Sequence, residues 1–257
     1  MERKQNVEPF TIITPTGDRR EVFRFCLRYI ERQTVPVPEW IIVDDGGEPL
    51  RLPTSIQNIY GLKYVRRERN PADPSHTLPV QLLEALKHVT TDRVLVMEDD
   101  DWYRADYCER MMEMFEAHSD AMVLGQGQAV YYHIPLRKCF QMVNRDRASL
   151  CQTGFRSAAI EKLTQGIFQH SSDPFVDLHL WRSSGLPHFL LLDVPPMCVG
   201  LKGLPGRIPK ETMGHWGTAR GYKSDPDGFK LRQLIGMEDA VMYEKYYNPS
   251  WTMSGVR

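Results

Sequence analysis

The sequence has no long apolar run, no strong excess of charge and no regular cysteine spacing. No stretch approaches the roughly 20 apolar residues of a membrane-spanning helix, and the N-terminal residues lack a secretory core, so we expect a cytoplasmic protein. The formal net charge of -1 gives the chain no overall attraction to nucleic acid or anionic lipid. The five cysteines include no C-x-x-C pair, which favours buried free thiols in a reducing compartment over structural zinc.

Strand and helix patterns alternate along the first half of the 257 residues, without internal repeats. Apolar, β-branched runs that end at turn residues indicate strands, and amphipathic stretches between them indicate helices. The expected strands are 10–14, 39–43, 62–65 and 93–97, and the expected helices are 19–33, 78–89 and 107–118. This alternation predicts an α/β fold with βαβ units in a mainly parallel sheet.

The pattern changes after residue 120. Strands are expected at 121–125, 129–133 and 189–194, the first two suggesting an antiparallel arrangement, and helices at 157–165, 175–184 and 229–247. Between 199 and 227 the chain is rich in Gly, Pro, Lys and Arg. A loop of this length in a compact domain is typically functional.

Residues Glu98, Asp99, Asp100 and Asp101, here called the acidic cluster, are the most informative stretch. Adjacent carboxylates repel one another, so they indicate either solvent exposure or a bound cation. The buried-strand pattern before them and the two aromatic residues after them favour the cation. At the carboxyl end of a strand, where open α/β sheets bind ligands, Mg²⁺ or Mn²⁺ held by carboxylates and substrate phosphates fits the position.

Two earlier turns follow expected strands in the same way, Thr14-Pro15-Thr16 after the first and Asp44-Asp45-Gly46-Gly47 after the second. With the acidic cluster, this ordered trio resembles glycosyltransferase family 2, inverting enzymes of the GT-A fold. The resemblance covers roughly the first 120 residues. It implies one GT-A domain over 1–257, with a nucleotide-sugar half at 1–120, an acceptor half at 121–257 that contains a smaller antiparallel sheet, and a closing loop at about 199–227.

The resemblance also assigns residues to the donor. The expected donor contacts are Thr14, Pro15, Thr16, Asp44, Asp45, Gly46, Arg69, Asp99, Lys202 and Arg207. The first turn would line the base and ribose, and either aspartate of the second turn would accept a hydrogen bond from them. Arg69 is a loose counterpart of an arginine that precedes the family's metal motif. The last two cations would contact the diphosphate from a loop that closes on donor binding.

The same resemblance implies Mn²⁺ or Mg²⁺ as cofactor, with Glu98, Asp100, Asp101 and His215 as candidate ligands. Asp100 best matches the metal-binding aspartate of the family's D-x-D-like motif, with Glu98 at its first position, although a register over 99–101 stays open. His215 would be an additional ligand from the closing loop.

Inverting transfer needs a carboxylate base that takes the proton of the acceptor hydroxyl. The family places this base at a helix start in the second half, where 171–179 is the best candidate segment. Asp177, within the expected helix, is preferred. Asp173 is the alternative, although a helix cap would explain it as well.

These features imply a metal-dependent transfer of sugar from a nucleoside diphosphate sugar, with UDP as the expected nucleotide, to an acceptor hydroxyl. The acceptor would be a glycan or, as in phage-type members, a hydroxymethylated pyrimidine in DNA, whose backbone the basic stretches 66–69 and 202–230 could follow. A nucleotidyltransferase acting on a sugar phosphate is the alternative. It ranks lower because the turn after the first strand has a single glycine. A non-catalytic binding module ranks third.

Overall fold

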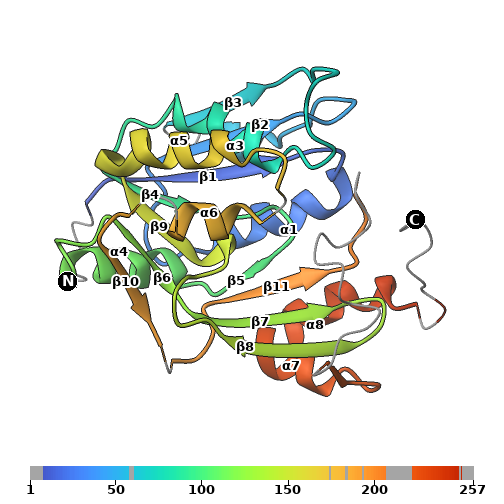
Figure 1. Cartoon of the computed structure of the whole chain (residues 1–257). Helices are drawn as coiled ribbons and strands as arrows, with labels where there is room; N and C mark the ends of the chain where they lie inside the picture. Colours follow the sequence, from blue (N-terminus) through green and yellow to red (C-terminus); the bar gives the residue numbers. More distant parts are fainter. Residues whose placement is uncertain are drawn as a thin grey trace, which may run out of the picture.

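The strands form two sheets, which Figure 1 shows one above the other. The structure is a computed structural model that describes residues 8–57, 61–173, 175–182, 185–192, 194–206, 222–248 and 250. The seven-stranded sheet has the order β10 (His188–Leu191), β6 (Val123–Gln126), β9 (Thr153–Arg156), β4 (Arg93–Val96), β1 (Phe10–Thr16), β2 (Glu39–Asp44), β3 (Leu62–Arg66). The five-stranded sheet has the order β12 (Lys223–Ser224), β8 (Lys138–Val143), β7 (Gln128–His133), β11 (Cys198–Lys202), β5 (Trp102–Tyr103).

The centre of the larger sheet consists of β1, β2 and β4, because their sequences are apolar on both faces. Every residue of β1 and β2 is buried, and β1 pairs in parallel with β2 on one side and β4 on the other. Such continuous apolar runs are typical of strands covered on both faces. The β2–β3 and β6–β10 pairs are also parallel. Among the described strands of this larger sheet, only β9 runs antiparallel to its neighbours. The expected mainly parallel α/β sheet is confirmed, and the smaller sheet is mostly antiparallel.

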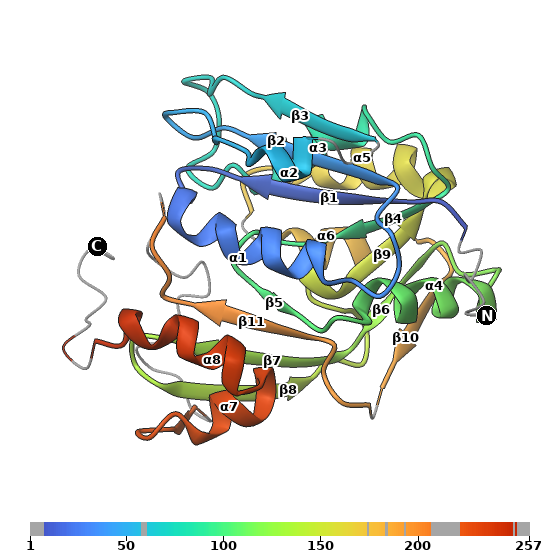
Figure 2. The same ribbon diagram turned by 180° about the vertical axis from the view of Figure 1, so that it is seen from behind.

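Helices cover both faces of the larger sheet, and the sheet separates two apolar cores. The helical segments include α1 (Arg20–Glu31), α2 (Thr54–Gln57), α3 (Leu78–Leu86), α4 (Tyr107–Ala117), α5 (Ile160–Gln169), α6 (Val176–Arg182), α7 (Phe229–Ile235), α8 (Met237–Tyr243), and the 3-10 turns η1 (Leu150–Gln152), η2 (Ser157–Ala159) and η3 (Glu244–Tyr246). One core lies beneath α3, α5 and α6 (Figure 1). The other is shared by α1, α4, α7, α8 and the smaller sheet (Figure 2). No helix of the described ranges is long and apolar enough to cross a membrane.

Two expectations for the C-terminal part are wrong. The helix expected at 229–247 breaks at Gly236, whose φ of 82° lies in the left-handed region, so α7 ends there and α8 begins. The segment 199–227 is not a single loop, because it contains most of β11 and all of β12. These short strands have little periodicity of their own and form by pairing with β7 and β8.

The strands expected at 121–125 and 129–133 form, but they belong to different sheets. The first is β6 in the larger sheet, and the second is β7 in the smaller one. The antiparallel partner of β7 is β8, which the sequence did not indicate. Only Cys139 of its six residues is buried, and Lys138 and Gln141 interrupt its apolar residues, so its apolar pattern is weak.

A buried carboxylate fixes α8 against the centre of the molecule. Asp239, 3% exposed, accepts hydrogen bonds from Trp102 Nε1 at 2.6 Å and Arg28 Nε at 3.1 Å, and it also pairs with Arg32. Trp102 lies on β5, Arg28 on α1 and Arg32 directly after α1, and Trp102 directly follows the acidic cluster in sequence. Asp239 therefore links the C-terminal helices to the chain segment that carries the cluster.

We expect Asp239→Ala to lower the free energy of unfolding by about 3–5 kcal/mol, because it leaves a buried group of donors and cations without their acceptor. The neighbouring Glu238, whose side chain is 84% exposed and pairs with Arg28, provides the matched control. Glu238→Ala should change stability by less than about 1 kcal/mol. Equilibrium urea unfolding measures both, and equal effects of the two substitutions would show that Asp239 does not hold α8.

Candidate functional site

The carboxyl ends of β1, β2 and β4 meet at one edge of the larger sheet, because the three strands are parallel neighbours. Thr16, the last residue of β1, lies opposite Asp44, the last residue of β2. Directly after β4, the backbone N–H of Met97 donates to the carbonyl of Ile13 at 3.0 Å. The Thr16 hydroxyl then donates to Asp99 Oδ2 at 2.5 Å. The structure thus brings together the three turns that the sequence analysis singled out.

Within the first turn, Thr16 is the residue that reaches the acidic cluster. Thr14 is fully buried, and its hydroxyl accepts a hydrogen bond from Trp40 Nε1 at 2.9 Å. Pro15 is also buried. The carbonyl of Thr16 accepts the backbone N–H of Asp45 at 3.2 Å, which joins the first turn to the second.

Arg19, between β1 and α1, neutralises part of the acidic cluster. Its Nη1 lies 2.7 Å from Asp100 Oδ2, and its Nε lies 3.5 Å from Asp99 Oδ1. A Cβ atom at Gly206 would lie 3.0 Å from Arg19 Cγ, so the segment after β11 passes close to this side chain. The sequence analysis did not assign Arg19 to the site. Its only signal was its place after the first turn, as one of two adjacent arginines at an expected helix start.

Lys202, at the end of β11, approaches the cluster from the smaller sheet. Its Nζ lies 3.5 Å from Asp101 Oδ1, which also accepts the backbone N–H of Leu201 at 2.9 Å. The structure therefore brings Lys202 to the acidic cluster, and its contact with the donor diphosphate stays a prediction. Arg207 and His215 lie outside the described residues.

Asp99 and Asp101 are buried, Glu98 and Asp100 are half-buried, and the four carboxylates affect one another strongly. Burial, reinforced by Asp101, raises the pKa of Glu98 well above its ordinary value. Burial also raises the pKa of Asp101, and it raises that of Asp99 to about 7 although Arg19 opposes it. For Asp100 burial acts in the same direction, but Arg19 and Lys202 outweigh it and the pKa falls below its ordinary value.

The donor set of the acidic cluster fits a hard divalent cation. Four carboxylates share two neighbouring cations, Arg19 and Lys202, and the pKa values of Glu98, Asp99 and Asp101 are raised first by burial and then by repulsion from the neighbouring carboxylates. Carboxylate oxygens are the ligands that Mg²⁺ and Mn²⁺ prefer. A bound divalent cation would add positive charge to that of Arg19 and Lys202, and more of the carboxylates of the cluster could then ionise.

Asp44 organises the turn after β2. Its Oδ1 accepts the backbone N–H of Gly46 at 2.9 Å, and its Oδ2 accepts the Leu50 N–H at 2.9 Å and the Tyr64 hydroxyl at 2.5 Å. Arg66 Nη1 lies 3.2 Å from Oδ1. Because protein donors engage both oxygens, Asp44 has a structural role in this turn.

The rest of this turn packs against the loop after β1. A Cβ atom at Gly46 would lie 2.7 Å from the backbone nitrogen of Asp18, so only glycine allows this close approach. Arg69 joins the same region: its Nε donates to the Asp45 carbonyl at 3.0 Å, and its Nη2 lies 3.0 Å from Asp18 Oδ2. The structure therefore brings Arg69 and Gly46 to the edge that carries the acidic cluster.

The two candidate bases differ in their surroundings. Asp173 accepts the Phe175 backbone N–H at 2.9 Å and pairs with His179 Nε2 at 2.8 Å, and these contacts lower its pKa. It therefore caps the segment that leads into α6. Asp177, in the first turn of α6, has its pKa raised by burial, against the effect of Arg147, whose Nε lies 3.5 Å from Oδ2.

Asp177 and Lys202, which lies beside the acidic cluster, both affect the pKa of the Tyr131 hydroxyl. Burial raises the pKa of the Tyr131 hydroxyl, Asp177 raises it further, and Lys202 opposes the change. Lys202 Nζ also lies 5.8 Å from the centroid of the Tyr131 ring. Asp177 and Lys202 therefore act electrostatically on the same side chain.

The raised pKa of Asp99 predicts that the metal-free protein loses stability as the pH rises. Asp99 keeps its proton to about pH 7 in the folded chain, whereas an unfolded aspartate loses it near pH 4. The folded state binds the extra proton between these values, so the free energy of unfolding falls there with rising pH. Asp99→Asn should reduce this slope in urea unfolding with EDTA. The control Asp92→Asn, at an exposed site before β4, should keep it. Equal slopes for wild type and Asp99→Asn would contradict the prediction.

Comparison with solved structures shows the fold. The crystal structure of S. aureus TarS 1-349 in complex with UDP-GlcNAc is similar with a TM-score of 0.55 and 16% identity, over 88% of this chain and 65% of that chain. The corresponding complex with UDP is similar with a TM-score of 0.54 and 15% identity, over 91% of this chain and 78% of that chain. A further S. aureus TarS structure is similar with a TM-score of 0.53 and 16% identity over 76% of this chain. The match covers only 37% of that longer chain.

Comparison of the sequence shows the family. No curated protein matches the chain. The family model of glycosyl transferase family 2 matches residues 11–158, which is more than half of the sequence. This stretch contains the turns after β1 and β2 and the whole acidic cluster. The chain therefore belongs to glycosyl transferase family 2 and has the GT-A glycosyltransferase fold.

Proposed function

We propose that this protein transfers a sugar from a UDP-sugar to an acceptor hydroxyl with inversion, using Mn²⁺ or Mg²⁺. The observation that carries the proposal is the acidic cluster at the carboxyl edge of β1, β2 and β4, between the cations of Arg19 and Lys202. Ligands of open α/β sheets bind at such an edge. The similarity to TarS, whose structures contain UDP-GlcNAc or UDP, supports the choice of nucleotide.

The donor half, residues 1–120, would hold the nucleotide at the turns after β1 and β2. Asp44 or Asp45 would accept a hydrogen bond from the base or ribose; the side chain of Asp44 is engaged by its own turn, and that of Asp45 lies 3.7 Å from Arg67 Nη1. Thr16 would keep its bond to Asp99 and so fix the first turn against the cluster. Arg69, at the rim of the same edge, is placed to contact the nucleotide.

The leaving diphosphate would lie between the acidic cluster and its two cations. Glu98 and Asp100 are the proposed metal ligands, because they match the first and third positions of the D-x-D-like motif; Asp100 is paired with Arg19, whereas Asp99 and Asp101 are held by Thr16 and by the backbone of β11. When bound, the metal supplies Lewis-acid stabilisation of the negative charge that develops on the leaving group. Arg19 and Lys202 add fixed positive charge at the same place, in a buried setting where it acts strongly. Arg207 and His215 remain predictions for the closing loop.

The acceptor half, residues 121–257, would supply the base. Burial raises the pKa of Asp177 above its ordinary value, which makes its carboxylate a stronger proton acceptor. Asp173 is the weaker candidate because its oxygens serve a helix cap and an ion pair.

A glycan is favoured over DNA as the acceptor. The arginines of the stretch 66–69 contact the protein itself: Arg66 reaches Asp44, Arg67 pairs with Asp73, and Arg69 contacts Asp18. Their charges are thus partly neutralised inside the donor half, which weakens the case that this stretch follows a phosphate backbone. Modified DNA should still be tested as an acceptor beside glycans.

Asp100→Ala should reduce transfer by at least about 100-fold, because it removes a proposed metal ligand beside the leaving group. The assay measures nucleoside diphosphate released from UDP-sugars with Mn²⁺ present. In a parallel assay, pyrophosphate released from a nucleoside triphosphate and a sugar phosphate would indicate the nucleotidyltransferase alternative. Asp92→Ala, at the opposite end of β4, is the control and should keep wild-type turnover. Metal-dependent turnover by Asp100→Ala at the wild-type rate would refute the assignment.

Asp177→Asn should lower the transfer rate by about 10²–10⁴-fold, because the amide cannot accept the acceptor proton. Its affinity for the UDP-sugar, measured by calorimetry, should stay at the wild-type value. Asp173→Asn is the matched control and should retain transfer within a few-fold of wild type. If Asp173→Asn loses transfer and Asp177→Asn does not, the base is Asp173.

A further inference from the structure

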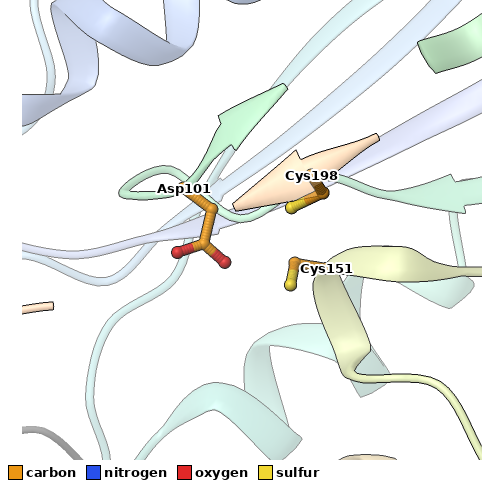
Figure 3. A group of neighbouring side chains, drawn as sticks. All are labelled: Asp101, Cys151 and Cys198. Atoms are coloured by element: carbon orange, nitrogen blue, oxygen red, sulfur yellow. The ribbon is translucent and has the colours of Figure 1, made fainter. Parts of the chain in front are cut away.

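Two cysteine thiols and a carboxylate lie together in Figure 3, and the Lys202 ammonium lies 3.5 Å from that carboxylate. The Sγ atoms of Cys151 and Cys198 and a carboxylate oxygen of Asp101 all lie within 4.8 Å of one another. The three residues come from η1, from the start of β11 and from the turn before β5. Because they are far apart in sequence and form no C-x-x-C pair, only the fold reveals the group.

All three side chains are removed from solvent, and one carboxylate oxygen lacks a strong donor. The exposed fractions are 1% for Asp101, 3% for Cys151 and 1% for Cys198. Asp101 Oδ1 accepts the Leu201 N–H, but no N–H or O–H of a described residue reaches the buried Oδ2. The carboxylate lies beside the two thiols in Figure 3. The Cys151 thiol, a weak donor, hydrogen-bonds to the Asp101 carboxylate. A buried carboxylate oxygen with no stronger partner is costly, which points to a ligand at this position.

We propose that Cys151, Cys198 and Asp101 bind a thiophilic divalent cation of the zinc class. Two sulfur ligands and one carboxylate are a set that zinc accepts, with a fourth position open to water. Mg²⁺ and Ca²⁺ prefer oxygen ligands throughout, so the thiols separate this site from the proposed donor metal at Glu98 and Asp100.

The local charges support a divalent ion. Two thiolates and one carboxylate carry three negative charges, and the Lys202 ammonium 3.5 Å from Asp101 carries one positive charge. A divalent cation makes the buried group neutral, which avoids the cost of burying net charge. Without a cation, Cys151 and Cys198 hydrogen-bond to each other as thiols, and these weak donors are the competing explanation.

The bound cation would position the acidic cluster. It would tie the turn that carries Asp101 to η1 and to β11, whose last residue is Lys202. Both Asp101 and Lys202 would then be held next to the carboxylates proposed for the donor metal. This role is structural, and the inference does not depend on which sugar or acceptor the enzyme uses.

Titration with Co²⁺ in the presence of a non-thiol reductant, at about pH 8 so that the ligands can lose their protons, tests the site directly. We expect one Co²⁺ per chain with a thiolate-to-cobalt charge-transfer absorption that Zn²⁺ abolishes and excess Mg²⁺ does not. Co²⁺ at the oxygen ligands of the acidic cluster gives no such band. Asp100→Ala should retain the band, which separates this inference from the proposed function.

Cys151→Ser and Cys198→Ser should each weaken Co²⁺ binding by more than about 100-fold, beyond the 10–100-fold typical for loss of an outer-shell partner. Cys139→Ser is the matched control, because Cys139 is another buried free cysteine but lies on β8. Circular dichroism checks that each variant is folded. Absence of the charge-transfer band in reduced, folded wild type would overturn the proposal even if both serine variants failed to fold. A charge-transfer band that persists in both the Cys151→Ser and the Cys198→Ser variant would also overturn the proposal.

Discussion

Four adjacent carboxylates at the end of a buried strand need positive charge beside them, and this need organises the whole edge of the larger sheet. Arg19 supplies charge from the start of α1, and Lys202 supplies it from the end of β11. The Thr16 hydroxyl fixes Asp99 from β1, and Asp239 holds α8 against the strand that follows the cluster. Segments from both sheets therefore converge on one charged site.

The elements that position this site could be predicted from the sequence because their signals are local. The strands β1, β2 and β4 are continuous apolar runs that end at turn residues, which is the pattern of strands buried on both faces. The strands β5, β9, β11 and β12 are only two to five residues long and were missed. Their pairing depends on partners distant in the chain, so no local pattern identifies them.

The candidate site was predictable to the extent that strand order determines it. Parallel neighbours place their carboxyl ends together, which explains why the turns after β1, β2 and β4 meet, although the contact of Thr16 with Asp99 was not predicted. The choice between Asp44 and Asp45 could not be made, because it depends on donors such as the Tyr64 hydroxyl that only the fold brings close. Arg19 contacts a carboxylate 81 positions away, and no motif in the sequence records that contact.

The most direct measurement is anomalous X-ray scattering from crystals soaked with Mn²⁺ and UDP. If the acidic cluster gathers a divalent ion against the leaving diphosphate, a manganese peak will lie within about 2.0–2.6 Å of carboxylate oxygens of Glu98 or Asp100 and of the phosphates. The same map should show Arg19 and Lys202 next to that site. Bound UDP without manganese at the cluster, with Asp100 still paired to Arg19, would contradict a metal-dependent glycosyltransferase.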